Sequence, residues 1–213
     1  METQTSYLKT TRAEPRDPRV DEWQEQVDLH LPPGNWPAVR SVPVSVLIPV
    51  KNEQSNLAAC IQRLLWANEI VVIDSQSTDA TIPIAQAMGA DVHQFYYQKE
   101  GWPKKKNWAL ENVPWRNEWV LIMDADEHMT CELAAEIAEV VTGRYPLGNG
   151  CGDGYFLNRR FMFMKRWIRH CGYYPSWNVR LFKHAVGLRQ HGLVAVGKGA
   201  RLRQHAVQLF CDH

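Results

Sequence analysis

The order of apolar runs and helical segments constrains the fold of this 213-residue chain more than any other feature. Short, nearly continuous apolar runs are typical of strands that are buried on both faces of a sheet. They occur at Val44–Val50, Glu69–Asp74, Asp91–Phe95 and Glu118–Asp124. Segments with helical signals lie at about residues 57–65, 81–88, 108–113 and 130–141. This alternation predicts a single α/β domain, with a mainly parallel central sheet flanked by helices on both sides.

Polar side chains follow the predicted strands where each strand ends. They are Lys51–Glu53 after the first strand, Asp74 and Asp79 after the second, and Asp124–Asp126 after the fourth. In open α/β sheets, ligands bind outside the carboxyl ends of the strands. We therefore expect these side chains to share one ligand-binding edge.

The segment Asp124-Ala125-Asp126 is the strongest candidate for chemistry. Two carboxylates separated by one residue can reach a common point where a strand opens into a loop. Mg²⁺ and Mn²⁺ prefer oxygen ligands, and often take one or two carboxylates together with substrate phosphates. An exposed acidic turn before a helix is the alternative. The position at a strand end favours metal binding.

Asp74 and a lysine-rich loop are the next candidates. A carboxylate at the position of Asp74 can accept a hydrogen bond from a base or a ribose, or can close a local turn, a role that suits Asp79 better. The lysines Lys104, Lys105 and Lys106 precede a predicted helix, whose N-terminus adds to their attraction for phosphate. The alternative for these lysines is a solvated turn.

Basic residues dominate the last third of the chain. Residues 1–139 contain 12 basic and 21 acidic side chains, whereas residues 140–213 contain 12 basic and two acidic ones, Asp153 and Asp212. This asymmetry indicates either an anionic partner (acidic lipid, phosphorylated glycan or nucleic acid) or a solvated tail.

Aromatic and basic side chains alternate in the segment Arg159–Arg169. We rank packing first for this segment, with Phe161, Phe163, Trp167 and Ile168 covering the core while the cations extend to water. Contact with an anionic membrane surface ranks second. Stacking of aromatic rings on acceptor sugars is the third interpretation.

The N-terminal residues 1–43 are rich in proline and lack regular periodicity, so we expect a partly irregular arm. The sequence shows neither a secretory signal nor an apolar run of the ~18 residues that span a membrane. The five cysteines lack metal-ligand spacing, which predicts reduced thiols and no zinc site. The resulting expectation is a cytoplasmic protein, with a peripheral position on the cytoplasmic face of the membrane as the second interpretation.

Six motifs occur in a fixed order, and together they cover about residues 44–184. They are Val44–Glu53, Ile73–Asp79, Lys105–Ala109, Met123–Glu127, Trp167–His170 and Tyr174–Phe182. In this order they resemble the family 2 glycosyltransferases of the GT-A fold. The likeness is greatest to the branch that contains lipopolysaccharide-core and exopolysaccharide enzymes.

The resemblance implies an inverting, metal-dependent transfer of a sugar from a nucleotide-sugar donor to a cell-surface glycan or lipid-linked acceptor. It implies the donor-binding residues Pro49, Glu53, Asp74, Lys104, Lys105, Asp124, Ala125 and Asp126, with Asp124 and Asp126 holding Mg²⁺ or Mn²⁺. We expect no nucleic-acid partner. A nucleotidyltransferase or phosphotransferase is disfavoured, because the first strand ends in Pro49 where a phosphotransferase nucleophile normally lies.

The chain departs from the family pattern after His184. The segment 185–213 contains no Glu and lacks the acid pair that usually follows in this branch, so we interpret it as an atypical tail, truncated or frame-shifted near Gly187. This leaves the general base unassigned, with Asp153 and Glu127 as the remaining nearby acids. The alternative function is therefore a catalytically impaired protein that binds sugar nucleotides.

Overall fold

The computed structural model describes residues 33–97, 104–144, 152–164, 166–170, 174–190, 193–196 and 202–212, with only the course of the backbone from Val186 onward. Most of the predicted N-terminal arm, residues 1–32, lies outside the described residues, as do residues 101–103 of the lysine-rich loop.

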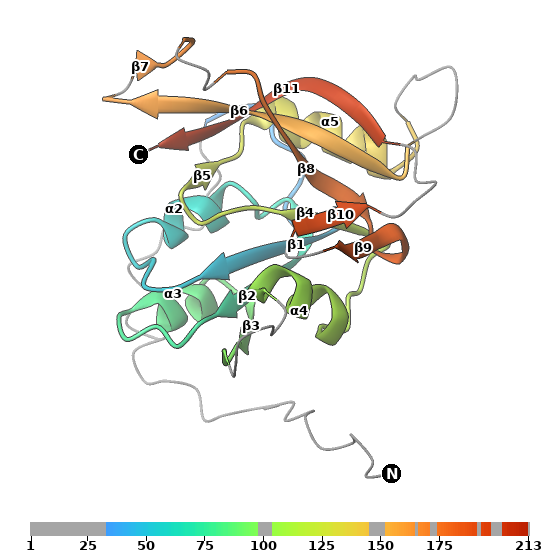
Figure 1. The fold of residues 1–213 in the computed structure, drawn as a ribbon. Coiled ribbons are helices and arrows are strands. Elements are labelled where there is room, and N and C mark those ends of the chain that lie inside the picture. Colours follow the sequence, from blue (N-terminus) through green and yellow to red (C-terminus); the bar gives the residue numbers. More distant parts are fainter. Residues whose placement is uncertain are drawn as a thin grey trace.

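Figure 1 shows an α/β fold in which one large sheet runs through the molecule. Its strands are β1 (Val42–Val50), β2 (Ala67–Asp74), β3 (Asp91–Gln94), β4 (Trp119–Ile122), β5 (Glu127–His128), β6 (Gly154–Phe163), β7 (Arg166–Trp167), β8 (Ser176–Lys183) and β11 (Leu202–Asp212). The helices are α2 (Leu57–Gln62), α3 (Thr81–Ala87), α4 (Lys105–Asn112) and α5 (Cys131–Val141). A short 3-10 helix, η1 (His184–Val186), leads to a separate pair of strands, β9 (Gly187–Gln190) and β10 (Leu193–Val196).

The first half of the sheet confirms the predicted parallel arrangement. The strand order is β3-β2-β1-β4-β8-β6-β11-β5, and the pairs β3–β2, β2–β1 and β1–β4 are parallel. The second half is mixed, because β8 lies antiparallel to both β4 and β6. Since two antiparallel steps separate β4 from β6, these two strands run in the same direction.

Side chains that alternate along the central strands build two hydrophobic layers, one on each face. In β1, Val46 and Ile48 pack on one face with α2, α3 and α5, whereas Leu47 packs on the other face with α4. All three side chains are fully buried. Helices on both faces therefore explain why the strand sequences are almost continuously apolar.

Two predicted helix boundaries have clear local causes. The Thr130 hydroxyl accepts a hydrogen bond of 3.2 Å from the backbone N–H of Leu133, so Thr130 is the N-terminal cap of α5. Gly89 follows α3 with a φ of +73°, a conformation that costs glycine little and other residues more. Thr130 follows the end of β4, whereas Gly89 precedes β3 at the opposite edge of the sheet, where its carbonyl oxygen accepts a hydrogen bond of 2.9 Å from Arg40.

The C-terminal segment is built largely of strands. The strand β11 pairs with β6 in parallel and with β5 in antiparallel orientation. The interpretation of residues 185–213 as a truncated or frame-shifted tail concerns the coding sequence and stays a prediction. None of the helices in the described part of the chain has the length and hydropathy needed to cross a bilayer.

Candidate functional site

A cavity of about 570 Å³ opens at the carboxyl ends of β1 and β4, between α4 on one side and β6 and β8 on the other. Basic and polar side chains line much of it. The lining residues are Pro49, Lys104, Lys105, Lys106, Asn107, Ile122, Asp124, Arg159, Trp177, Asn178, Val179 and Arg180. Among these described lining residues, five are basic and Asp124 alone is acidic, so the cavity suits an anionic ligand.

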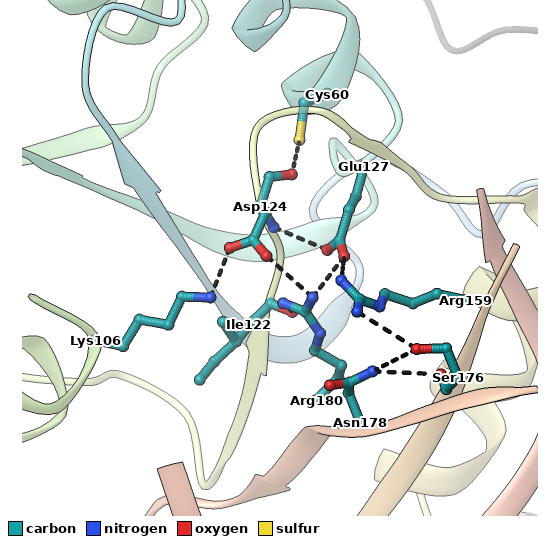
Figure 2. A network of polar contacts seen from close by, with 9 residues as sticks. All are labelled: Cys60, Lys106, Ile122, Asp124, Glu127, Arg159, Ser176, Asn178 and Arg180. Atoms are coloured by element: carbon teal, nitrogen blue, oxygen red, sulfur yellow. Dashed lines mark hydrogen bonds and ion pairs between the residues drawn. The ribbon is translucent and has the colours of Figure 1, made fainter. Parts of the chain in front are cut away.

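Asp124 lies on the turn directly after β4, and both of its carboxylate oxygens are held by cations (Figure 2). Its Oδ1 is 2.6 Å from Lys106 Nζ, and its Oδ2 is 3.0 Å from Arg180 Nη2. Burial alone would raise the pKa of Asp124, but the adjacent Arg180 and Lys106 outweigh it and lower that pKa below its ordinary value. The carboxylate is therefore ionised across the physiological pH range.

The buried side chain of Glu127 holds the backbone of this turn in place. It is only 1% exposed, and its Oε2 accepts a hydrogen bond of 2.9 Å from the backbone N–H of Asp124. Its Oε1 lies 2.5 Å from Arg180 Nη2 and 3.5 Å from Arg159 Nη1. A general base must reach the proton of an acceptor hydroxyl. Glu127 is instead buried and bonded to the protein itself, so its contacts are those of a positioning residue.

The rest of the acidic turn divides into a buried and a partly exposed residue. Ala125 is buried in the core layer, whereas Asp126 is partly exposed. The buried Cys60 thiol lies 3.7 Å from the carbonyl oxygen of Asp124 and packs the turn against α2. Asp124 and Asp126 thus lie on one turn, but of the two only Asp124 is among the described residues that line the cavity, and their sharing of one ligand stays a prediction.

The two carboxylates match the donor set that a divalent cation takes when it shares its coordination with a diphosphate. The described residues contain no cluster of three or more His, Cys, Asp or Glu side chains arranged to hold a metal ion. A site made of Asp124 and Asp126 would need substrate phosphates to complete it, and metal binding by these two residues stays a prediction. Because Lys106 and Arg180 already hold Asp124, a cation there would share or replace one of these ion pairs.

Asp74 closes a local turn at the end of β2. It is fully buried and accepts hydrogen bonds of 2.9 Å from the backbone N–H and 2.5 Å from the hydroxyl of Ser77. Nearby, Lys105 Nζ donates a hydrogen bond of 2.6 Å to the carbonyl oxygen of Val50. Burial lowers the pKa of Lys105, although the charge of Asp74 opposes that shift. The ligand-binding role of Asp74 stays a prediction.

Glu53 and Asp79 lie on two neighbouring loops that bond to each other. Asp79 accepts hydrogen bonds from the backbone N–H of Thr81, at 3.0 Å, and from that of Gln54, at 3.2 Å. The backbone N–H of Glu53 donates to Thr81 Oγ1 at 2.8 Å, and Glu53 Oε2 accepts from Asn56 Nδ2 at 3.0 Å. Asp79 thus closes a local turn, the role that its sequence position favours over ligand binding.

Asp153, one of the two candidate bases, is not brought to this cavity. Its backbone oxygen accepts a hydrogen bond of 2.9 Å from the N–H of Lys183, which pairs with Trp119 at the beginning of β4. Asp124 follows the other end of β4, so the sheet separates the two acids by the length of that strand. The position of Asp153 gives no support to a catalytic role.

Sequence reasoning missed Arg159, Arg180 and Trp177 as lining residues of the cavity. Arg180 is 5% exposed, which is unusual for an arginine and requires paired acids. The available signal was an arginine inside the apolar run Val179–Phe182, but its partners cannot be read from that run.

Comparison with known proteins identifies the family. Residues 45–187 match the family model described as glycosyl transferase family 2, which is well over half of the chain. The chain belongs to glycosyl transferase family 2. Its members are transferases, and this match confirms the resemblance carried by the ordered motifs.

Individual relatives agree with this membership. An uncharacterized glycosyltransferase of Rickettsia prowazekii is 35% identical over 100 residues, which are 46% of this chain and 33% of the relative. The lipopolysaccharide core biosynthesis glycosyltransferase LpsC of Rhizobium meliloti is 31% identical over 106 residues, 48% of this chain and 38% of the relative. The matched region thus spans about a third of the length of these relatives.

Solved structures confirm the GT-A fold. S. aureus TarS 1–349, in a complex with UDP-GlcNAc, has a TM-score of 0.56 at 16% identity, over 81% of this chain and 59% of that one. Glucosyl-3-phosphoglycerate synthase from Mycobacterium tuberculosis, in a complex with phosphoglyceric acid, has a TM-score of 0.50 at 18% identity, over 80% of this chain and 71% of that one. At these identities, the likeness shows the fold alone.

Proposed function

We propose that this chain binds a nucleotide-sugar donor at the cavity between α4 and β8 and transfers the sugar to a glycan or lipid-linked acceptor on the cytoplasmic side of a membrane. The observation that carries the proposal is the placement of five basic lining residues around Asp124, at the carboxyl ends of parallel strands, in a member of glycosyl transferase family 2. That arrangement fits a diphosphate, the anionic part of a nucleotide sugar.

The donor site divides into a phosphate end and a nucleoside end. At the phosphate end, Lys106 and Arg180 are aimed at Asp124 and are close enough to the cavity to bind phosphate oxygens as well. At the nucleoside end, Pro49 lines the cavity, while Asp74 and Lys105 order the neighbouring loops. We assign Lys104 and Glu53 to the same donor site, on the margins of these two ends.

Asp124 and Asp126 would hold Mg²⁺ or Mn²⁺. When bound, such a cation neutralises charge on the diphosphate and makes it a better leaving group. Glu127 keeps the Asp124 turn in place, because it bonds to the backbone of Asp124 and to Arg180 together. The protein therefore contributes a preformed anionic turn inside a cationic cavity.

The transfer itself forms one bond and breaks another. An acceptor hydroxyl attacks the anomeric carbon of the sugar, the bond from that carbon to the diphosphate oxygen breaks, and the hydroxyl proton passes to a base. In-line attack inverts the configuration at the anomeric carbon. Lys106, Arg159 and Arg180 are the lining cations suited to stabilise the negative charge that develops on the leaving diphosphate.

The second candidate function is a donor-binding protein with impaired catalysis. One observation favours it: Glu127 is buried against two guanidinium groups, and Asp153 lies at the opposite end of β4. In this second function neither candidate base reaches an acceptor, whereas the five basic lining residues still bind the donor phosphates. The two functions differ in turnover and agree in donor binding.

The test measures donor binding and turnover in parallel. The protein is titrated with a panel of sugar nucleotides that includes UDP-GlcNAc, with Mg²⁺, with Mn²⁺ or with EDTA, and release of the nucleoside diphosphate is followed separately. Binding with release supports the transferase, and binding without release supports the impaired form. Failure of every donor to bind in the presence of metal would refute both.

Two variants and a control locate the metal site. Asp124→Asn and Asp126→Asn should weaken metal-dependent donor binding by at least about tenfold, equivalent to ~1.4 kcal/mol. Asp91→Asn is the matched control, because Asp91 is an exposed acid that pairs with Arg116 away from the cavity. Equal affinity of all three variants and the parent protein would rule out the proposed metal site.

A further inference from the structure

The hairpin formed by β6 and β7 ends in two exposed apolar side chains. Phe163 is 59% exposed and Met164 is 80% exposed. The packing interpretation of this segment is therefore wrong for Phe163, which points to solvent instead of covering the core. Adjacent exposed apolar side chains at the tip of a hairpin indicate a surface that a membrane or a partner molecule covers.

Cations surround this tip. Arg166 and Arg169 are exposed, and the guanidinium groups of Arg160 and Arg169 lie 4.6 Å and 4.3 Å from the ring centre of Trp167. The sequence from residue 159 to residue 170 contains five basic residues and no acidic one. The hairpin thus has an apolar tip, Phe163 and Met164, and beside it a group of exposed arginines, Arg166 and Arg169, here called the basic collar.

The hairpin projects at the edge of the sheet that carries the candidate site. Because β6 runs in the same direction as β4, its end at Phe163 lies on the side where β4 leads into Asp124, and Figure 1 shows β6 and β7 at the upper left, the side toward which β1 also points. Arg159 lines the cavity four residues before Phe163. At strand spacing, this is a distance of about 13 Å.

We propose that the β6–β7 hairpin docks this protein onto an anionic lipid surface. Phe163 and Met164 enter the region between headgroups and acyl chains, while Arg166 and Arg169 bind the phosphates of anionic lipids. A lipid-linked acceptor in that surface would then lie beside the cavity. This last step rests on the proposed function, whereas the lipid contact itself does not.

Two other occupants fit the hairpin less well. A second copy would bring two basic collars together, and like charges repel. A nucleic acid would be attracted by the arginines, but it offers no hydrocarbon for Met164. The combination of exposed apolar tip and basic collar is the arrangement that an anionic membrane surface accommodates.

The test is co-sedimentation of the full chain with lipid vesicles. One set contains phosphatidylcholine alone, and the other has part of it replaced by phosphatidylglycerol. We expect binding to the anionic vesicles that weakens as salt rises. Arg166→Gln with Arg169→Gln should weaken it by roughly 25-fold, since each arginine near such a surface contributes about fivefold.

Matched variants separate this surface from general effects. Phe163→Ser with Met164→Ser should also reduce binding to the anionic vesicles, whereas Val39→Ser, which changes an exposed apolar residue elsewhere, and Arg144→Gln should not. The same variants should bind the nucleotide-sugar donor with the affinity of the parent protein. A loss of vesicle binding is therefore measured independently of a loss of donor binding.

Three results would overturn the proposal. The first is an absence of binding to anionic vesicles by the parent protein. The second is unchanged binding by the paired hairpin variants. The third is self-association in sedimentation velocity that Phe163→Ser with Met164→Ser abolishes, without any vesicle binding, because this result assigns the surface to a second copy.

Discussion

Glu127→Gln should destabilise the protein strongly, because it removes the charge of one member of a buried ion pair. The side chains of Glu127 and Arg180 are 1% and 6% exposed, and the oxygen and nitrogen are 2.5 Å apart. Removing one partner of such a pair typically costs about 3–5 kcal/mol. At about 2–4 °C for each kcal/mol in a chain of this size, the unfolding midpoint should fall by roughly 6–20 °C.

The ion pair of Lys106 with Asp124 provides the control, because it has similar chemistry at higher exposure. These two side chains are 33% and 32% exposed, and the distance is 2.6 Å. Exposed pairs typically contribute about 0.2–1 kcal/mol. Lys106→Met should therefore lower the midpoint by no more than about 4 °C. Burial, not distance, accounts for the expected difference between the two variants.

The assay is thermal unfolding followed by circular dichroism at neutral pH, with Glu127→Gln, Arg180→Met and the double variant forming a cycle. The double variant should lose less stability than the two single losses added together, because it removes both buried charges instead of leaving one without its nearest partner. A Glu127→Gln variant within about 1 kcal/mol of the parent protein would refute the reasoning, as would strictly additive losses.

Three further predictions concern single side chains. The pKa of Asp124 is lower in the folded protein than its ordinary value of about 3.9, so the ionised carboxylate stabilises the fold. This stabilisation is complete above about pH 3.9 and is lost as the pH falls through the folded-state pKa. Urea unfolding should show the loss for the parent protein and not for Asp124→Asn. Asp74→Asn should weaken donor binding by roughly tenfold through the Ser77 turn, measured by calorimetry, and an unchanged affinity would exclude Asp74 from the donor site. Lys105→Met removes the bond from the first residue of α4 to the carbonyl oxygen of Val50, so proteolysis should detect a looser first turn of α4, whereas equal cleavage rates would contradict this.

The parallel half of the fold could be predicted because each of its strands is buried on both faces. Leu47 and Ile48 pack on opposite faces of β1, so both must be apolar, and the run is visible in the sequence. The antiparallel half has no such signal. In β6, the consecutive residues Arg159 and Arg160 are partly buried, as are Phe161 and Met162 after them, and the segment therefore resembles an amphipathic surface element.

The candidate site follows the same division. Asp124 and Asp126 were predictable, because acids directly after an apolar strand lie at its carboxyl end. The pairing of Arg180 with Asp124 and Glu127 was not, because it depends on the register between β4 and β8, in which Leu121 lies opposite Leu181. That register joins residues far apart in the chain, and no local pattern specifies it.

The arginine and lysine beside Asp124 change what the acidic motif means for donor binding. From the sequence, Asp124 is a metal ligand that should attract a cation. In the structure, Lys106 and Arg180 bind its two oxygens and also line the cavity, so Asp124 and a diphosphate compete for the same donors. A divalent cation resolves this competition, because it would bind Asp124 and leave both side chains to the phosphates. We therefore expect donor binding to depend on metal because the ion pairs of Asp124 occupy Lys106 and Arg180. Since Asp124→Asn removes the competing charge, this variant should bind nucleoside diphosphate in EDTA at least as tightly as the parent protein.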